Sequence, residues 1–331
     1  MILITGGAGY IGSHTAIALL EENNDILIVD NLENSSIKSI DRIKEITGKS
    51  FKFHKGDIRN EDFLLSIFQN YEIKAVMHFA GLKSVGESNC YPMKYFDNNV
   101  IGFLSLIKVM QKFDCKKIVF SSSATVYGNP TELPVKESAQ LSSINPYGRS
   151  KLIIEQILED IYNSDKSWNI SILRYFNPVG AHESGLIGED PKNVPTNLFP
   201  IVSKVASGEL TSLEIYGNDY ATHDGTGVRD YIHVTDLAKG HICALSKFNS
   251  DGSIFSLNLG TGKGYSVLDV IKEFEAVSGK KIAYNIVDKR IGDSASCYAD
   301  PAYAKKYMNW SSKFSLRKMC EDQWRWQQSN K

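Results

Sequence analysis

Tyr147 and Lys151 are the residues of this chain whose types and spacing most directly suggest chemistry. They lie four positions apart at the start of a predicted helix, for which Asn145 is a suitable N-cap and Pro146 suits the first position. Residues i and i+4 share one face of a helix. A nearby cation stabilises a phenolate and lowers the pKa of a tyrosine, which makes a general acid/base for a sugar or alcohol hydroxyl. An ordinary surface Tyr and Lys is the alternative for this pattern taken alone.

The composition is that of an ordinary globular protein. The 331 residues are 42% hydrophobic and carry a formal net charge of −1, which indicates neither nucleic acid nor a membrane surface as a partner. The five cysteines are scattered, so we expect no metal site and no disulfide framework, and a cytoplasmic location fits. The sequence has no apolar run of 18 residues, and its first predicted strand begins at Met1, so we expect no membrane span and no cleaved signal peptide.

The N-terminal segment predicts a dinucleotide-binding loop. A short apolar run leads into glycines at positions 6, 7, 9 and 12, and a helical pattern follows. Such a loop lets the backbone approach a pyrophosphate and aims a helix N-terminus at it, although a merely structural turn is the alternative. The next apolar run ends at Asp30. A carboxylate there would accept a hydrogen bond from a ribose 2′-hydroxyl and repel a 2′-phosphate, so NAD is favoured over NADP.

Strand-like and helix-like patterns alternate through the first half of the chain. This alternation predicts an α/β fold with a doubly wound parallel (Rossmann) sheet. Regularity falls from about residue 178, which predicts a smaller, mixed C-terminal substrate domain. We expect the NAD-binding domain to span 1–177 with contributions from about 231–262, and the interleaved substrate domain to span 178–331.

The motifs described above, together with the serine-rich strand end at 121–123, resemble those of the extended short-chain dehydrogenase/reductase superfamily. The resemblance covers essentially the whole chain. It implies a catalytic triad of Ser123, Tyr147 and Lys151. In that triad, Ser123 would hydrogen-bond the substrate, and Lys151 would bind the nicotinamide ribose and hold down the pKa of Tyr147.

The expected cofactor contacts lie mainly at the carboxyl ends of the predicted strands, where such sheets bind ligands. With the resemblance, the predicted NAD-binding residues are Gly6, Gly9, Tyr10, Ile11, Gly12, Asp30, Asn31, Asn34, Ser35, Asp57, Ile58, Phe79, Ala80, Gly81, Lys83, Asn98, Ser121, Tyr147, Lys151 and Tyr175.

Three segments of the second half, with residues 5–14, resemble UDP-galactose 4-epimerases: 175–182, 197–198 and 225–234. The resemblance implies reversible interconversion of UDP-glucose and UDP-galactose, by transient hydride transfer to tightly bound NAD through a 4-keto intermediate. The implied substrate contacts are Lys83, Ser123, Tyr147, Phe176, Asn177, Asn197, Leu198, Tyr216, Arg229, Arg290, Asp293 and Cys297. The two arginines can neutralise a diphosphate through forked hydrogen bonds, with ordinary surface charge as the alternative.

Other activities of related enzymes are less well supported. Nucleotide-sugar 4,6-dehydratases that resemble this chain carry Asp-Glu directly after their catalytic Thr, whereas Ser123 is followed by Ala124 and Thr125. Elimination of water is therefore disfavoured. A different epimerase, a nucleotide-sugar reductase and a non-catalytic NAD-binding regulator remain as rivals, the last weakened by the complete triad.

Two further expectations concern substrate range and assembly. Cys297 stands where some epimerases have a bulky tyrosine, which leaves room for an N-acetyl group and predicts activity on UDP-N-acetylglucosamine and its galacto epimer. A shift of one residue would place Tyr298 there instead. The helical patterns at 92–111 and 147–162 are apolar over more than one face, which, with the resemblance, predicts a homodimer through a four-helix bundle.

Overall fold

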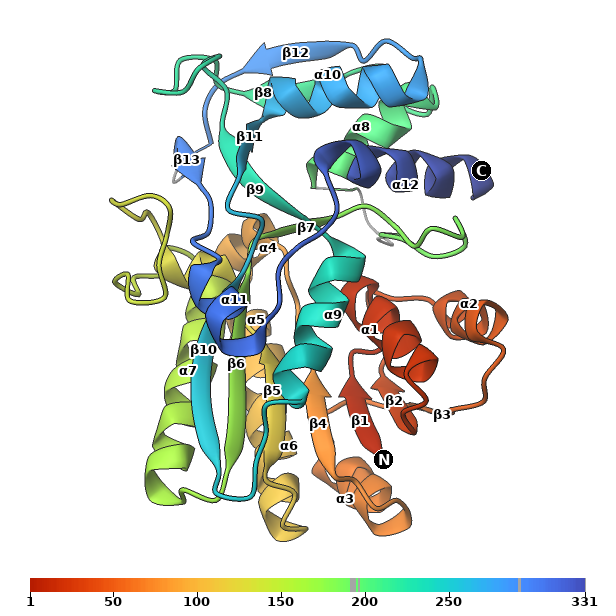
Figure 1. The fold of residues 1–331 in the computed structure, drawn as a ribbon, viewed down its shortest axis with the longest axis vertical. Coiled ribbons are helices and arrows are strands. Elements are labelled where there is room, and N and C mark those ends of the chain that lie inside the picture. Colours follow the sequence, from red (N-terminus) through yellow and green to blue (C-terminus); the bar gives the residue numbers. More distant parts are fainter. Residues whose placement is uncertain (191–194, 196, 291–292, 331) are drawn as a thin grey trace. The chain divides into compact units, whose positions relative to one another are not determined.

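The computed structural model describes all residues except 191–194, 196, 291–292 and 331 (Figure 1). Its contacts divide the chain into two units. The first comprises Met1–Gly128, Leu141–Tyr175 and Ala238–Leu257, and the second comprises Asn129–Gln140, Phe176–Leu237 and Asn258–Lys331.

This division differs from the predicted boundaries in three places, of which the smallest is that the second unit begins at Phe176 and not at 178. Residues 129–140 belong to the second unit, because the Val135 N–H donates to the Tyr298 carbonyl and the Asp300 N–H donates to the Val135 carbonyl, each at 2.8 Å. The late contribution to the first unit is also shorter than predicted, since it covers 238–257 and not 231–262.

The first unit is built on a seven-stranded sheet in the order β10-β6-β5-β4-β1-β2-β3. The strands are β1 (Ile2–Thr5), β2 (Ile26–Asp30), β3 (Lys52–Lys55), β4 (Ala75–His78), β5 (Lys117–Ser121), β6 (Asn169–Tyr175) and β10 (Ser253–Leu259). The pairings from β3 through β6 are parallel. The sheet, its helices and its likeness to solved structures reported below confirm the predicted α/β Rossmann class.

Helices cover this sheet because its strands are apolar on both faces; β1 and β2 are buried at every position. The helices of the first unit are α1 (Tyr10–Glu21), α2 (Ile37–Thr47), α3 (Glu61–Asn70), α4 (Val85–Cys90), α5 (Pro92–Tyr95), α6 (Gly102–Lys112) and α7 (Pro146–Ser164), with α9 (Val234–Leu245) crossing the boundary. Apolar residues of α3, α6 and α7 form one core with the sheet, and α1 packs against β1 and β2.

One helix departs from the predicted regular form. The sequence predicts a single helix from Pro92 to about residue 111, but the structure has a π-helical segment, Phe96–Ile101, between α5 and α6. Insertions of this kind inside α-helices are frequently found at functional sites.

The second unit contains two small sheets. In the first, β9 (Val228–His233) pairs with β11 (Gly264–Ser266), with β13 (Ser296–Cys297) and with β7 (Asn177–Val179); in the second, β8 (Leu213–Tyr216) pairs with β12 (Tyr284–Val287). Apolar residues of α8 (Leu198–Ala206), α10 (Val267–Ser278) and α12 (Leu316–Ser329) form its core, and α11 (Ala302–Met308) precedes α12. Across the described residues of both units, every helix is too short or too polar to cross a membrane.

Candidate active site

The glycine loop between β1 and α1 is shaped by close backbone contacts. A Cβ added at Gly12 would lie 2.3 Å from the Gly6 carbonyl oxygen, and one at Gly6, where φ is +71°, would lie 2.5 Å from the Ala80 nitrogen. Neither position accepts a side chain. Gly9 is the N-cap of α1 and has no side chain to cap the helix. The backbone N–H groups of the first turn can therefore bind a ligand.

Asp30 joins this loop to the segment that follows β2. Its carboxylate accepts from the Ala8 N–H at 3.0 Å, from the Leu32 N–H at 2.9 Å and from the Ser35 hydroxyl at 2.7 Å. It therefore has a fixed orientation at the carboxyl end of the strand. Asn31 donates in turn to Asp57 at 3.1 Å, which connects the ends of β2 and β3.

Asp57 itself is held as a carboxylate. Arg59 donates to it at 2.8 Å, and these bonds lower the pKa of Asp57 to about 2. The neighbouring predicted contacts differ in exposure: Ile58 is buried, and Asn34 is exposed.

Tyr147 lies at the centre of a buried hydroxyl network in the first unit. Its hydroxyl lies close to those of Ser123 and Tyr175, and Tyr175 lies close to Ser121, near enough for these neighbours to act on the pKa of each phenol. Thr125 adds a hydroxyl that donates to the Ser123 oxygen at 2.9 Å. The structure therefore brings together side chains from the ends of β5 and β6 and the first turn of α7.

Lys151 lies one turn along α7, on the same side as Tyr147, but its ammonium group is engaged elsewhere. It donates to the Ser121 carbonyl at 2.8 Å and lies 4.9 Å from the centre of the Phe120 ring. Burial lowers the pKa of Lys151 to about 8, while the nearby Glu155 carboxylate acts to raise it.

The expectation that Lys151 holds down the pKa of Tyr147 stays a prediction. Burial raises the pKa of the Tyr147 phenol well above its ordinary value, and the Ser123 hydrogen bond only partly opposes this. The physical reason is that removing the phenol from water penalises its charged form, while the ammonium is directed at a backbone carbonyl.

The π-helical segment places two consecutive asparagines beside this network. Asn98, a predicted cofactor contact, is half-buried, and Asn99 is buried. The Asn99 side chain accepts from the Leu82 N–H at 2.8 Å and donates to the Ser150 hydroxyl at 2.9 Å. Asn99 thus holds the loop after β4 against α7, a role that the sequence pattern did not show.

The remaining predicted cofactor residues lie around the same sheet edge. Tyr10 and Ile11 at the glycine loop and Phe79 and Ala80 after β4 are half-buried. Gly81 and Lys83, further along the loop after β4, are exposed. Lys83 acts electrostatically on Tyr175, so it lies near the hydroxyl network.

A second group of predicted residues gathers in the second unit around two arginines. The Arg290 guanidinium lies 3.6 Å from the centre of the Tyr216 ring. Arg229, on β9, lies 3.8 Å from Asp293, whose N–H donates to the Arg290 carbonyl at 3.2 Å. Arg229 also donates to the Val228 carbonyl at 2.9 Å, which leaves most of its fork for other partners.

Cys297 lies beside this cluster. It is paired in parallel register with Arg229, so the two side chains lie on the same face of adjacent strands. Tyr298 lies elsewhere, because a Cβ added at Gly264 would be 3.1 Å from its ring. Burial raises the pKa of the Cys297 thiol to about 11, so it remains a neutral thiol.

Four further predicted substrate residues of the second unit make other contacts. Phe176 is buried just before β7, and Asn177 is exposed on that strand. Asn197 is the N-cap residue of α8 but donates its side chain to Glu189 at 2.7 Å, and Leu198 begins the helix. Asn177 pairs with Tyr231 on β9, two residues along that strand from Arg229.

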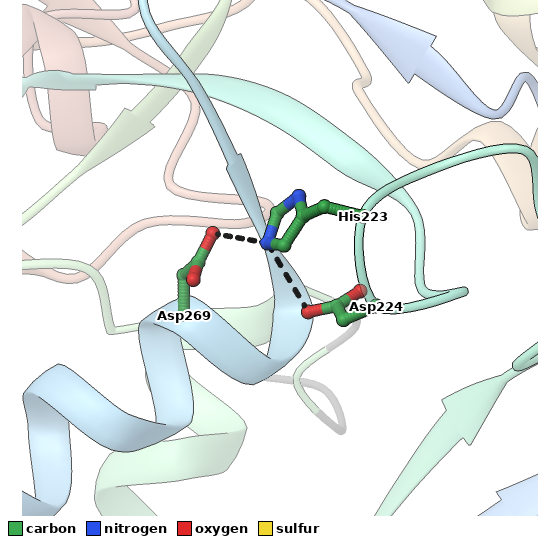
Figure 2. A group of neighbouring side chains, drawn as sticks. All are labelled: His223, Asp224 and Asp269. Atoms are coloured by element: carbon green, nitrogen blue, oxygen red, sulfur yellow. Dashed lines mark ion pairs between the residues drawn. The ribbon is translucent and has the colours of Figure 1, made fainter.

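Sequence reasoning predicted no metal site, yet three ligand-type side chains of the second unit converge. The His223 ring nitrogen lies 3.2 Å from Asp269 and 3.6 Å from Asp224 (Figure 2). Asp269, however, forms a capping box with Ser266 at the start of α10, and Asp224 accepts from Ser266 and Thr226. These bonds account for both carboxylates, so we assign the cluster a structural role as the cap of α10.

Comparison with known proteins identifies the family. The family profile described as GDP-mannose 4,6 dehydratase matches residues 3–323. The UDP-glucose 4-epimerase of Bacillus subtilis (strain 168) is 54% identical over 99% of this chain and 97% of its own length. The chain belongs to the UDP-glucose 4-epimerase family. This confirms the resemblance inferred from the motifs.

Solved structures of the UDP-glucose 4-epimerase family show the same fold. The Bifidobacterium longum enzyme, crystallised with NAD⁺ and UDP, has a TM-score of 0.96 at 52% identity, covering 99% of this chain and 98% of that one. The UDP-Glc/GlcNAc 4-epimerase of Campylobacter jejuni has a TM-score of 0.85 at 34% identity, covering 99% of both chains.

Proposed function

We propose that this member of the UDP-glucose 4-epimerase family is an NAD-dependent isomerase that interconverts UDP-glucose and UDP-galactose through a 4-keto sugar. The observation that carries the proposal is the buried Tyr147 phenol, which lies close to the Ser123 hydroxyl at the carboxyl end of the sheet. Its relatives share this activity by name and match the chain almost from end to end.

The residues of the first unit fit NAD as the cofactor. The loop from Gly6 to Gly12 leaves no room for a Cβ and opens onto a helix N-terminus, which suits a pyrophosphate. Asp30 is fixed at the end of β2 and suits a ribose hydroxyl, whereas it would repel the 2′-phosphate of NADP. When bound, NAD supplies hydride acceptance from C4 of the sugar and hydride return.

The protein supplies proton transfer, orientation and binding. In its phenolate form, which the nearby Lys151 ammonium is expected to favour, the Tyr147 oxygen would take the proton of the C4 hydroxyl and later return it, with the Ser123 hydroxyl close by. Arg229 and Arg290 would hold the diphosphate through charge-assisted hydrogen bonds. Anchoring the nucleotide while few groups bind the sugar allows the sugar to turn, so that C4 is inverted.

The mechanism predicts the fate of a label at C4. With UDP-glucose deuterated at C4, the UDP-galactose produced is expected to retain the deuterium at C4, because the hydrogen leaves and returns within one site. Mass spectrometry of the separated sugars measures this. Exchange of the label with solvent would instead indicate proton abstraction from carbon and would overturn the hydride mechanism.

We also propose that N-acetylated UDP-sugars are substrates. Cys297 lies beside Arg229 with its side chain on the same face, whereas the Tyr298 ring lies against Gly264. This register favours the small residue, and not the tyrosine, as the neighbour of the sugar. A related solved epimerase bears both UDP-Glc and UDP-GlcNAc in its name.

Enlarging Cys297 is expected to separate the two activities. The Cys297→Tyr variant should lose about 100-fold in kcat/KM for UDP-N-acetylglucosamine, because the ring would occupy the space of the acetyl group. Its kcat/KM for UDP-glucose should change by no more than about threefold. Chromatographic assays of both sugars measure this, with Cys297→Ser as the size-matched control. Equal losses on both sugars would contradict the proposal.

We further propose that the protein is a homodimer. Four large apolar side chains between residues 85 and 101 are exposed: Val85 at 40%, Tyr91 at 63%, Met93 at 75% and Ile101 at 49%. Exposed apolar residues concentrated in one segment are typical of a protein–protein contact. Met93 and Ile101 lie in the 92–111 pattern that the sequence, together with 147–162, assigned to a four-helix interface, and Val85 and Tyr91 lie just before it.

Sedimentation velocity at micromolar concentration tests the dimer. The wild-type protein should sediment as a dimer, and Met93→Glu should shift it toward the monomer, because a charge in an apolar interface is costly. Tyr284→Ser, at an exposed apolar residue of β12, serves as the control and should leave the dimer intact. A monomeric wild type would overturn the proposal.

A further inference from the structure

A buried ion pair lies directly behind the hydroxyl network. Glu155, on α7, and Arg174, near the end of β6, have side chains that are 1% and 4% exposed. The Arg174 Nη2 donates to Glu155 Oε2 at 2.6 Å, and its Nε lies 3.1 Å from both carboxylate oxygens. A buried charge pair is costly to desolvate, so its geometry and additional hydrogen bonds need an explanation.

The pair also bonds to the two strand ends of the site. Ser122, which is fully buried between Ser121 and Ser123, donates its hydroxyl to Glu155 Oε1. The Ser122 N–H donates to the Leu173 carbonyl at 2.9 Å, which ties the end of β5 to β6 just before Arg174. Arg174 completes its bonds by donating to the Tyr127 hydroxyl at 3.1 Å.

Glu155 occupies a specific place on its helix. It follows Lys151 by four residues and Tyr147 by eight, so the three side chains lie in succession along one face of α7. Each of them faces the strand ends: Tyr147 lies close to Ser123, Lys151 donates to the Ser121 carbonyl, and Glu155 accepts from Ser122. Each of three consecutive serines thus contacts a side chain from a different turn of α7.

We propose that Glu155 and Arg174 are positioning residues, which lock α7 to the carboxyl ends of β5 and β6 and so hold Ser123, Tyr147 and Lys151 in register. This inference rests on the proposed function, because it assumes that Tyr147 is the acid/base group that must be held in place. Neither residue needs to touch substrate, because their bonds act through Ser122 and through the helix.

Glu155 has a second consequence for Lys151. Burial lowers the pKa of Lys151 to about 8, and the Glu155 carboxylate opposes this. The other titratable groups around Lys151 are Tyr147 on the same helix, Tyr175 at the end of β6 and His78 on β4, where burial lowers the pKa of His78 to about 3. Those three are neutral near pH 7, so loss of the Glu155 charge should make Lys151 lose its proton at lower pH.

Two variants of the holoenzyme test this inference. Ser122→Ala removes only the hydroxyl that joins Glu155 to the strand end, and it should lower kcat by about tenfold with KM for UDP-galactose unchanged. Glu155→Gln should lower kcat further and shift the Lys151 titration midpoint downward by about one pH unit. Glu159→Gln, one turn further along α7 and exposed, is the control and should match wild type.

The Lys151 midpoint is read without turnover, by NMR of protein carrying ε-¹³C lysine, with Lys151→Arg to assign the signal. Because removing one partner of a buried pair can prevent folding, Ser122→Ala decides the matter by kcat if Glu155→Gln does not fold. The inference would be overturned if Ser122→Ala kept wild-type kcat and, where Glu155→Gln folds, the Lys151 titration midpoint of that variant stayed at the wild-type value. If the wild-type protein is inactive but the Lys151 midpoint still moves in Glu155→Gln, the proposed function is wrong and the coupling of Glu155 to Lys151 stands.

Discussion

Replacing Tyr147 with phenylalanine is expected to lower kcat for conversion of UDP-galactose to UDP-glucose by about 10²–10⁴-fold, the range in which a positioned general acid/base contributes. The substitution removes the phenol oxygen, which lies close to the Ser123 and Tyr175 hydroxyls, and leaves the ring in its buried place. KM should change little, because the contacts proposed for UDP lie in the second unit. Initial rates under saturating substrate measure the effect.

The control for this substitution separates chemistry from packing. Tyr95 is also a buried tyrosine of the first unit, and its hydroxyl donates to Glu87 at 2.9 Å and not to the Ser123 network. Tyr95→Phe should keep kcat within about threefold of wild type. A Tyr147→Phe enzyme that retained wild-type kcat would show that the phenol is not the acid/base group.

Replacing Gly12 with alanine is expected to abolish retention of NAD and to reduce activity by at least about 100-fold. The new methyl group would lie 2.3 Å from the Gly6 carbonyl oxygen and 2.8 Å from the Gly7 Cα. Both atoms belong to the backbone, so the loop itself must move, and overpacking of this kind also costs about 1–3 kcal/mol of stability. Release of nucleotide from denatured protein, quantified by absorbance, measures the NAD content.

Gly86 provides the matched glycine control, because a Cβ added there meets no atom within 4 Å. Gly86→Ala lies within α4, where alanine is favoured over glycine, so NAD content and activity should be unchanged. Normal NAD content in Gly12→Ala would contradict the assignment of the loop as the pyrophosphate site.

The parts of the site that depend on local spacing could be predicted from the sequence. The glycine loop follows a strand and begins a helix, and Asp30 ends the next strand, as the patterns indicated. Asn145 caps α7 by accepting from the Gly148 N–H at 2.8 Å, and Pro146 begins the helix, so Tyr147 and Lys151 share one face as expected. Such features require only the helical and strand periods and the residue types at element ends.

The partners of these side chains could not be predicted, because they depend on how distant segments pack. The spacing of Tyr147 and Lys151 indicates a shared face but not that the ammonium group is bonded to the Ser121 carbonyl, which comes from β5. Burial of the phenol, which acts to raise its pKa, is likewise a property of the packed unit. The π-helical segment and the Glu155–Arg174 pair also left no periodic signal.

The measurement that tests the central claim most directly is an epimerisation assay of the purified protein on UDP-galactose, with no cofactor added. We predict conversion to UDP-glucose until both epimers are at equilibrium, without net formation of NADH, because the hydride that leaves C4 returns to it. No conversion with or without added NAD, or formation of NADH in proportion to substrate consumed, would contradict the assignment of 4-epimerase activity.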